Sequence, residues 1–268
     1  MGLLLKAVLA GLALWGALVL LMAALQTSML FPRSLVGPAP ALPDATERLR
    51  LSHVDGGTLE GVRIAGRDPA RPLLLGFGGN AWNAESVALF LHQIAPEHPV
   101  AAFHYRGYTP STGRPSATAL KADAEAIHDL LTPEAPHGIV AVGFSVGSGI
   151  AAHLAQTRPI AGAVLVTPFD ALVNVARQSL PWAPVRWLFR HDMRTLDALA
   201  QSDTPVAIII ATRDEVIPPA RAEALVRGLA DAGRPAQLVE RIAAQHNDIY
   251  SHADFARSLR EAIGRVVP

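Results

Sequence analysis

Five segments of this chain are apolar almost without interruption, and they constrain its fold more than any other feature. They read PLLLGF, PVAAFHY, GIVAVGF, IAGAVLVT and PVAIIIAT. A strand with one face in water alternates apolar and polar residues, whereas a strand covered on both faces is apolar throughout. The segments therefore predict a mostly parallel sheet with helices on both of its faces.

The stretches between these strands carry helical spacing, so strands and helices alternate along the chain. Helices are predicted over residues 84–94, 116–131, 146–156, 219–229 and 253–266. Two further segments, RLRLSHV and LEGVRI, read as a strand pair around the turn DGGT, and AQLVER reads as a short strand near the C-terminus. A chain of 268 residues suits one globular domain, which we expect over residues 47–268.

The N-terminal segment, residues 1–31, carries no charge from Ala7 to Phe31. As a helix this uncharged run would extend about 37 Å, more than the roughly 30 Å of hydrocarbon in a bilayer, so it predicts a transmembrane anchor. A cleaved signal peptide is the alternative, with Ala23 and Ala24 as small residues for a peptidase, although its apolar core is normally only ~7–15 residues long. The positive charges near the two ends do not settle the orientation.

The composition excludes several classes of function. Lys and Arg total 23, Asp and Glu also total 23, and neither sign is clustered, so no nucleic-acid partner is expected. The chain has no cysteine, which excludes disulfides, a cysteine nucleophile and thiolate-ligated metals.

Residues 32–46 are rich in proline and lack periodicity, so they are predicted to be a linker.

The segment GFSVG joins a predicted strand to a predicted helix and suggests a nucleophile. A serine in a strained turn between a strand and a helix is exposed at the edge of the sheet, and small residues on either side let the two elements approach. Gly143, Ser145 and Gly147 have this spacing, whereas Ser148 falls inside the helix. We expect Ser145 to be the nucleophile and the amide of Val146 to face the oxyanion that forms during attack.

A serine hydroxyl needs a base and an orienting carboxylate, and in folds with this turn they follow in the order acid, histidine. Asp214 follows a predicted strand, and His246 lies in a polar loop before the last helix. Asp214 and His246 are therefore the predicted partners of Ser145. The alternatives are Glu215 and Asp170 for the acid, and for the base they are His104, His137, His153 and His191.

The loop GFGGNAWN is predicted to supply a second donor to the oxyanion. In this fold that donor is a backbone amide after the third strand, and the amide of Asn80 is our candidate. Gly78 and Gly79 allow the backbone to approach closely. The chain has no G-x-x-x-x-G-K-[ST] motif, so a phosphate-binding loop is not expected.

These motifs resemble those of the α/β-hydrolase superfamily, and within it the small serine hydrolases with one N-terminal membrane anchor. The resemblance covers nearly the whole chain and is carried by QTSMLFP, FGGN, HYRGYTPSTGRPS, GFSVGSG, RDEVIP and QHND. It implies an α/β-hydrolase fold of the eight-stranded type with a small cap, and it favours an extracytoplasmic location. Gly78 stands where this group usually has histidine.

The resemblance also places the cap at residues 168–203, between two strands. Trp182, Trp187 and Phe189 in this segment either line an acyl groove or pack the cap against the core. For Arg106, in the distinctive HYRGY stretch, the readings are structural packing or substrate contact.

Together, the residues and the resemblance predict a serine hydrolase that cleaves carboxylic esters or thioesters through an acyl-enzyme on Ser145. A serine peptidase or an acyltransferase would use the same side chains, and a non-catalytic binding protein at the membrane is the alternative from another class. The expected partners are a small acyl ester or lipid-like substrate and the membrane. No metal or organic cofactor is implied, and the oligomeric state is left open.

Overall fold

A computed structural model of the chain describes residues 2–52 and 56–267. His53 and Val54 of the predicted strand pair, and Asp55 of its turn, lie outside the described residues. The strands are β1 (Glu47–Ser52), β2 (Thr58–Ile64), β3 (Leu73–Phe77), β4 (Val100–Phe103), β5 (Ile139–Phe144), β6 (Gly162–Val166), β7 (Val206–Ala211) and β8 (Leu238–Ile242).

The helices alternate with the strands after β3, as the sequence predicts. They are α1 (Gly2–Leu30), α2 (Ala84–Ile94), α3 (Ala117–Leu131), α4 (Val146–Thr157), α5 (Leu172–Ser179), α6 (Val185–Leu188), α7 (Thr195–Ala200), α8 (Pro219–Asp231) and α9 (Phe255–Val266). Three short 3₁₀ turns are also present, at Arg33–Leu35, Thr132–Glu134 and Ile249–Ser251.

The strands form one eight-stranded sheet in the order β1-β2-β4-β3-β5-β6-β7-β8. The pairs β1/β2 and β2/β4 are antiparallel, and the remaining neighbours are parallel, so the predicted mostly parallel sheet is confirmed. β5 lies near the middle of the sheet between β3 and β6. The parallel strands end at one common edge, and the loops that follow them meet there.

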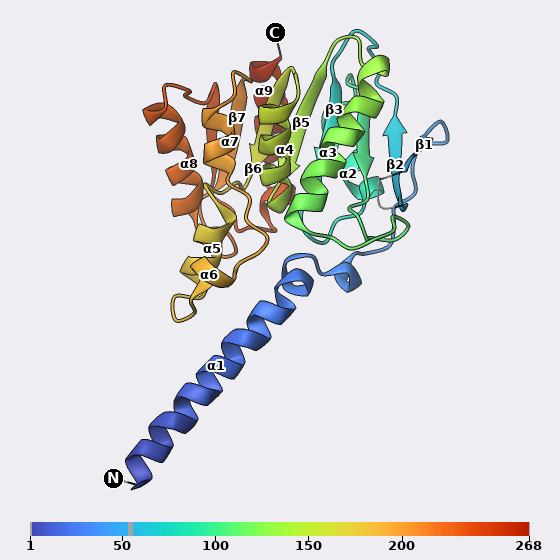
Figure 1. The fold of residues 1–268 in the computed structure, drawn as a ribbon. Coiled ribbons are helices and arrows are strands. Elements are labelled where there is room, and N and C mark those ends of the chain that lie inside the picture. The colour runs from blue at the N-terminus through green and yellow to red at the C-terminus, as the bar shows by residue number, and fades with distance from the viewer. Residues whose placement is uncertain (1, 53–55, 268) are drawn as a thin grey trace.

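Alternate residues of the central strands enter two separate hydrophobic cores, one on each face of the sheet. In β3, Leu73 and Leu75 join the core under α3, α4, α7 and α8, whereas Leu74 joins the core under α2 and α9 (Figure 1). In β7, Ile208 and Ile209 divide in the same way. Because both faces are buried, both sets of positions must be apolar, which explains the uninterrupted runs in the sequence.

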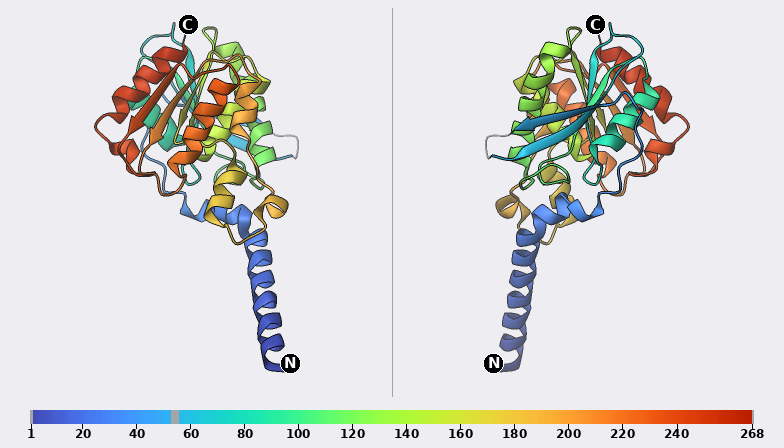
Figure 2. Two further views of the ribbon diagram at one scale, coloured as in Figure 1. Left: turned by 90° about the vertical axis from the view of Figure 1, so that its left-hand side faces the viewer. Right: turned by 90° about the vertical axis from the view of Figure 1, so that its right-hand side faces the viewer.

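Helix α1 projects away from the globular part of the molecule in both views of Figure 2. At its last turn it meets the carboxyl edge of the sheet, where Phe31 is only 2% exposed. Val19 and Gln26 are its only buried residues, and most of its leucines are exposed. The helix is long and apolar enough to cross a membrane. Unlike an apolar helix in the core of a soluble protein, it is mostly exposed.

A buried carboxylate holds the antiparallel end of the sheet to α2. Glu85 is 4% exposed, and its carboxylate lies 2.8 Å from the His104 ring and 2.6 Å from the Arg48 guanidinium. The contact with His104 is the main reason that the pKa of Glu85 is lowered from 4.5 to about 2, against burial, which raises it. The ionised carboxylate therefore stabilises the folded state.

We expect Glu85→Gln to lower the free energy of unfolding at pH 7 by about 1–3 kcal/mol, because it leaves the buried His104 ring without a carboxylate. A carboxyl whose pKa is lowered by folding stabilises the protein above its unfolded pKa and loses that effect as the pH falls through the folded pKa. The stability of the wild type should therefore fall between pH 4.5 and about 2, and that of the variant should fall less.

Denaturation in detergent at several pH values measures both effects. Glu261→Gln is the control, since Glu261 is 39% exposed and its pair with Arg265, at 3.6 Å, should contribute less than about 1 kcal/mol. Equal pH profiles for wild type and Glu85→Gln would contradict this account.

Candidate active site

Ser145 lies between the last residue of β5 and the first residue of α4, in a strained backbone conformation. Its φ of 52° and ψ of −118° are rare for a residue with a side chain. Its amide donates to Val166 O at 2.9 Å, and its carbonyl accepts from the Ser148 hydroxyl at 2.6 Å. These bonds hold the backbone of Ser145 on both sides, so the turn is fixed by its surroundings.

The glycines of the GFSVG motif are required by close backbone contacts. A Cβ atom on Gly147 would lie 2.2 Å from Phe77 O at the end of β3, and one on Gly143 would lie 2.5 Å from Gly147 O. Both distances are far below any real contact, so a side chain at either position would push α4 away from the sheet. The spacing of the motif therefore follows from how closely α4 packs against β3 and β5.

The structure brings Ser145, His246 and Asp214 together in one chain of hydrogen bonds. Ser145 Oγ lies 3.0 Å from His246 Nε2, and His246 Nδ1 lies 2.7 Å from Asp214 Oδ2. Asp214 and His246 are 7% and 6% exposed. The three residues come from loops after β5, β7 and β8. Along the chain, His246 is 101 residues from Ser145 and 32 residues from Asp214.

The carboxylate of Asp214 is held in place by its own loop. Its other oxygen, Oδ1, accepts hydrogen bonds from the amides of Val216 at 2.9 Å and Ile217 at 2.7 Å. Both carboxylate oxygens therefore have partners, and Oδ2 is directed at the imidazole. This arrangement fixes the ring so that the His246 nitrogen facing Ser145 can accept a proton.

The two alternative acids lie elsewhere. The carboxylate of Glu215 is exposed and accepts from the His246 amide at 3.1 Å, and this bond is the main cause of its lowered pKa. Asp170 instead pairs with Asn174 at 2.7 Å and with Arg221 at 3.4 Å. Of these three carboxylates, only that of Asp214 contacts a ring nitrogen of His246.

Three of the alternative histidines have partners of their own. His104 pairs with Glu85 at 2.8 Å, His153 pairs with Glu125 at 2.6 Å, and His191 lies 2.7 Å from the Thr27 hydroxyl. His137 is exposed, after α3. Among the described residues, none of these four histidines is hydrogen-bonded to Ser145, whereas His246 is.

The loop after β3 lies beside Ser145, where a Cβ atom on Gly79 would be 3.8 Å from the Ser145 Cβ. Two buried tyrosines hold this loop through its carbonyl groups. Tyr105 donates its hydroxyl to Gly78 O at 2.5 Å, and Tyr108 donates to Asn80 O at 2.6 Å. Burial raises the pKa of both tyrosines, so both hydroxyls keep their protons and remain donors.

The amides of Asn80 and Val146 make no hydrogen bond with any other described residue. Val146 directly follows Ser145, and Asn80 belongs to the loop beside it, so these two amides are the candidates to receive the negative oxygen of a tetrahedral intermediate. Arg106 has a different role, because its guanidinium is buried and forms a bidentate ion pair with Asp123 of α3. This ion pair connects the Tyr105–Tyr108 segment, which holds the loop after β3, to α3.

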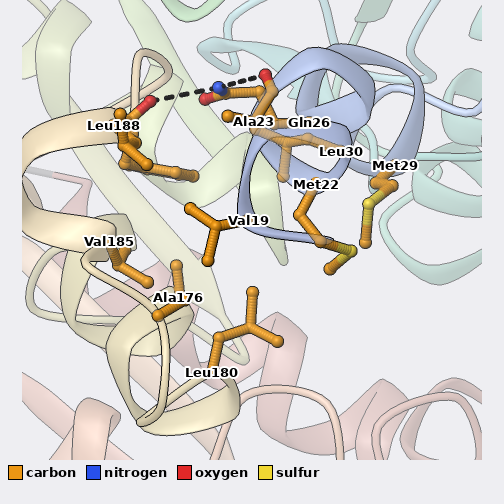
Figure 3. A pocket seen from close by; sticks show the side chains of 12 residues that line it. Val19, Met22, Ala23, Gln26, Met29, Leu30, Ala176, Leu180, Val185 and Leu188 are labelled. Atoms are coloured by element: carbon orange, nitrogen blue, oxygen red, sulfur yellow. Dashed lines mark hydrogen bonds between the residues drawn. The ribbon is translucent and has the colours of Figure 1, made fainter. Parts of the chain in front are cut away.

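An apolar groove of about 230 Å³ lies between α1 and the cap segment, residues 168–203 (Figure 3). We call it the α1 groove, and its wall on α1 consists of Val19, Met22, Ala23, Gln26, Met29 and Leu30. Its opposite wall comes from α5, α6 and adjoining residues between 176 and 189. Within the same segment, α7 packs beside α4 and α8 in the helical layer and does not reach the groove.

The three aromatic residues predicted in the cap occupy different environments. Phe189 lines the α1 groove. Trp187 is 82% exposed, and Trp182 is 42% exposed and accepts a hydrogen bond at its carbonyl from Trp15 of α1, at 3.1 Å. The contact between α1 and the cap segment is not predicted from the sequence. The signal that could have indicated this contact is the polar run Gln26, Thr27 and Ser28 near the end of a mostly apolar helix.

No cluster of three His, Cys, Asp or Glu side chains able to hold a metal ion occurs within residues 2–52 and 56–267. The arrangement of Ser145, His246 and Asp214 can carry out acyl transfer with side chains and backbone amides alone.

Comparison with known proteins identifies the family. A family profile described as the alpha/beta hydrolase fold matches residues 73–192. An uncharacterized protein of Mycobacterium tuberculosis is 32% identical over 224 residues, which cover 79% of this chain and 77% of that protein. The alpha/beta hydrolase domain-containing protein WAV2 of Arabidopsis thaliana is 25% identical over 262 residues, which cover 87% of this chain and 84% of that protein.

The fold also matches solved structures. The Pyrococcus furiosus esterase Pf2001 has a TM-score of 0.66 at 17% identity, with 85% of this chain and 97% of that chain covered. An alpha-beta hydrolase of Vibrio vulnificus has a TM-score of 0.67 at 20% identity, with 83% and 81% covered. At such identities the likeness concerns the fold alone. By its profile match, its relatives and its fold, the chain belongs to the α/β-hydrolase superfamily.

Proposed function

We propose that the protein is a serine hydrolase that cleaves carboxylic esters or thioesters through an acyl-enzyme on Ser145. One observation carries the proposal: His246 lies within hydrogen-bonding distance of both the Ser145 hydroxyl and the Asp214 carboxylate. A serine so placed loses its proton to the imidazole as it attacks a carbonyl. That the similar Pyrococcus furiosus structure is named an esterase is in keeping with this chemistry.

In the proposed first half-reaction, Ser145 Oγ bonds to the substrate carbonyl carbon while His246 Nε2 takes the hydroxyl proton. The carbonyl oxygen becomes an oxyanion, which the amides of Asn80 and Val146 stabilise. Asp214 Oδ2 accepts a hydrogen bond from the Nδ1–H group of the imidazolium and stabilises its positive charge without taking the proton. When the bond to the leaving group breaks, His246 gives the proton to the leaving atom. This atom is the oxygen of an alcohol in an ester, or the sulfur of a thiol in a thioester.

In the second half-reaction, water attacks the acyl carbonyl and gives its proton to His246. The bond to Ser145 then breaks, its oxygen recovers the proton, and the free acid leaves. A serine peptidase or acyltransferase would share these steps and differ in leaving group or acceptor. A panel of esters, peptide amides and alternative acyl acceptors separates these activities, and a non-catalytic protein would turn over none of them.

We further propose that α1 tethers the enzyme to a membrane. The support is its exposed apolar surface along most of its 29 residues. Cleavage after Ala23 or Ala24 would remove Trp15, Val19 and Met22, which contact the cap segment or line the α1 groove. These contacts favour a retained helix over a removed signal peptide.

Ser145→Ala should lower kcat for a short-chain ester by about 10⁴-fold or more, because no other group can form the acyl-enzyme. It should also abolish labelling by a fluorophosphonate probe. The measurements are initial rates and in-gel fluorescence of the detergent-solubilised full chain. Ser179→Ala, an exposed serine of α5, is the control and should be labelled as the wild type is. Persistent labelling of Ser145→Ala would refute the assignment.

Asp214→Asn should lower kcat by about 10³–10⁴-fold, because an amide cannot hold the imidazole in the required tautomer. Asp170→Asn, at the other acid considered from the sequence, should keep kcat within about threefold once its melting temperature shows it to be folded. The comparison uses the same ester. If Asp170→Asn had the larger effect, the orienting acid would have to be reassigned.

Tyr108→Phe should lower kcat about 10-fold and leave KM within about twofold. The substitution removes the donor that holds Asn80 O at 2.6 Å, which loosens the amide proposed for the oxyanion, and a whole oxyanion donor contributes about 10²–10³-fold. Steady-state kinetics separate the two constants, and the melting temperature monitors packing. A loss confined to KM would mean that Tyr108 acts on substrate binding instead.

A further inference from the structure

The α1 groove differs from an ordinary crevice between helices in its chemistry. Of its twelve lining residues only Gln26 is polar. Both walls are therefore suited to hydrocarbon, and its volume of about 230 Å³ is below that of pockets for drug-sized ligands, about 300–1,000 Å³. An apolar groove of this volume suits a single hydrocarbon chain.

The side-chain amide of Gln26, the one polar residue of the groove, has hydrogen-bond partners for both its nitrogen and its oxygen. Gln26 Nε2 donates to Leu188 O at 3.1 Å, and Gln26 Oε1 accepts from the Arg190 amide at 2.8 Å. Figure 3 shows the first of these bonds closing the end of the groove between α1 and the cap segment. Because both ends of the amide have partners, Gln26 fixes the spacing of the walls and leaves no unsatisfied polar group to repel an apolar ligand.

Further bonds along α1 keep the two walls together. The Trp15 indole donates to Trp182 O at 3.1 Å, and the Arg190 guanidinium donates to Ala23 O at 2.9 Å. Near the end of α1, Phe31 packs edge-on against His191 with ring centres 5.5 Å apart. The helix is thus docked on the cap by contacts from residue 15 to residue 31.

The groove has the length of one lipid acyl chain. From Val19 to Leu30 the helix rises about 16 Å, which is close to half of the roughly 30 Å hydrocarbon core of a bilayer. The remaining surface of α1 exposes leucines such as Leu18, Leu21 and Leu25. If these face a membrane, the groove is continuous with an apolar environment from which a hydrocarbon chain can enter.

The cap segment connects the groove wall to the nucleophile helix α4. After Phe189 the cap segment runs to Met193, and a Cβ atom on Gly149 of α4 would lie 2.8 Å from the Met193 sulfur. Gly149 is one turn after Ser145. Phe31, the residue after α1, belongs to the same hydrophobic core as Val146.

We propose that the α1 groove binds the acyl chain of a membrane-derived lipid ester or thioester whose carbonyl is attacked by Ser145. This inference rests on the proposed function and specifies its substrate class. It makes α1 a wall of the substrate site as well as a tether, and it predicts that preference for long chains depends on residues of α1.

A pair of neighbouring substitutions on α1 tests the proposal in the full-length protein. Ala23 lines the groove, whereas Ala24 is exposed, so Ala23→Trp fills the groove and Ala24→Trp adds the same side chain outside it. With p-nitrophenyl esters in detergent micelles, Ala23→Trp should lower kcat/KM for the hexadecanoyl ester at least 10-fold and leave the butanoyl ester within twofold. Ala24→Trp should leave both within twofold.

A second pair on the opposite wall guards against misfolding of the first. Ala176→Trp fills the groove from α5, and Arg177→Trp, at the next, exposed position, is its control. If both groove-filling variants kept the chain-length profile of the wild type, the groove would not hold the acyl chain. Equal losses in the filled and control variants would also overturn the proposal.

A binding measurement separates failure of this inference from failure of the proposed function. Ser145→Ala in detergent is irradiated with a diazirine-bearing hexadecanoic acid, and the labelled peptides are identified by mass spectrometry. We expect labels in residues 19–30 and 176–189, reduced at least fivefold by Ala23→Trp. Labelling elsewhere, or labelling unaffected by Ala23→Trp, contradicts the groove. Labelling of the groove together with no esterase activity in the wild type contradicts only the proposed reaction.

Discussion

The contact between the first turn of α4 and the ends of β3 and β5 determines the geometry of the whole site. It is possible only because Gly143 and Gly147 lack side chains that would collide with the backbone at 2.5 Å or less. This contact forces Ser145 into its positive φ at the middle of the carboxyl edge. The loops after β7 and β8 reach the same edge because their strands run parallel to β5, so Asp214 and His246 can meet Ser145 across the sheet.

Much of this arrangement follows from the sequence. The parallel strands are evident because burial on both faces leaves no polar positions, and the order of Ser145, Asp214 and His246 follows from the chain direction. The order of residues along the chain does not by itself distinguish Asp214 from Asp170, because both follow parallel strands. It depends on which carboxylate reaches His246 Nδ1 in space, and only coordinates give that 2.7 Å contact.

The contact between α1 and the cap segment was the main feature that the sequence did not predict. Its residues are apolar on every side, so periodicity indicates no preferred face and gives no sign of a neighbour within the protein. Gln26 and Thr27 are among the few polar residues of α1, and both contact the cap segment. The exposed position of Trp187 and the place of α7 in the helical layer were equally hidden, because aromatic composition does not tell an interior residue from a surface one.

Helix α1 is continuous up to Leu30, and the cap segment is hydrogen-bonded to its last turns, so no flexible spacer separates the two. For the proposed enzyme, tethered to a bilayer by this helix, the amount of substrate per volume of solution is no longer the relevant variable. Turnover would follow the mole fraction of substrate in the surface, and diluting that surface with inert lipid would act as a competitive inhibitor does in free solution.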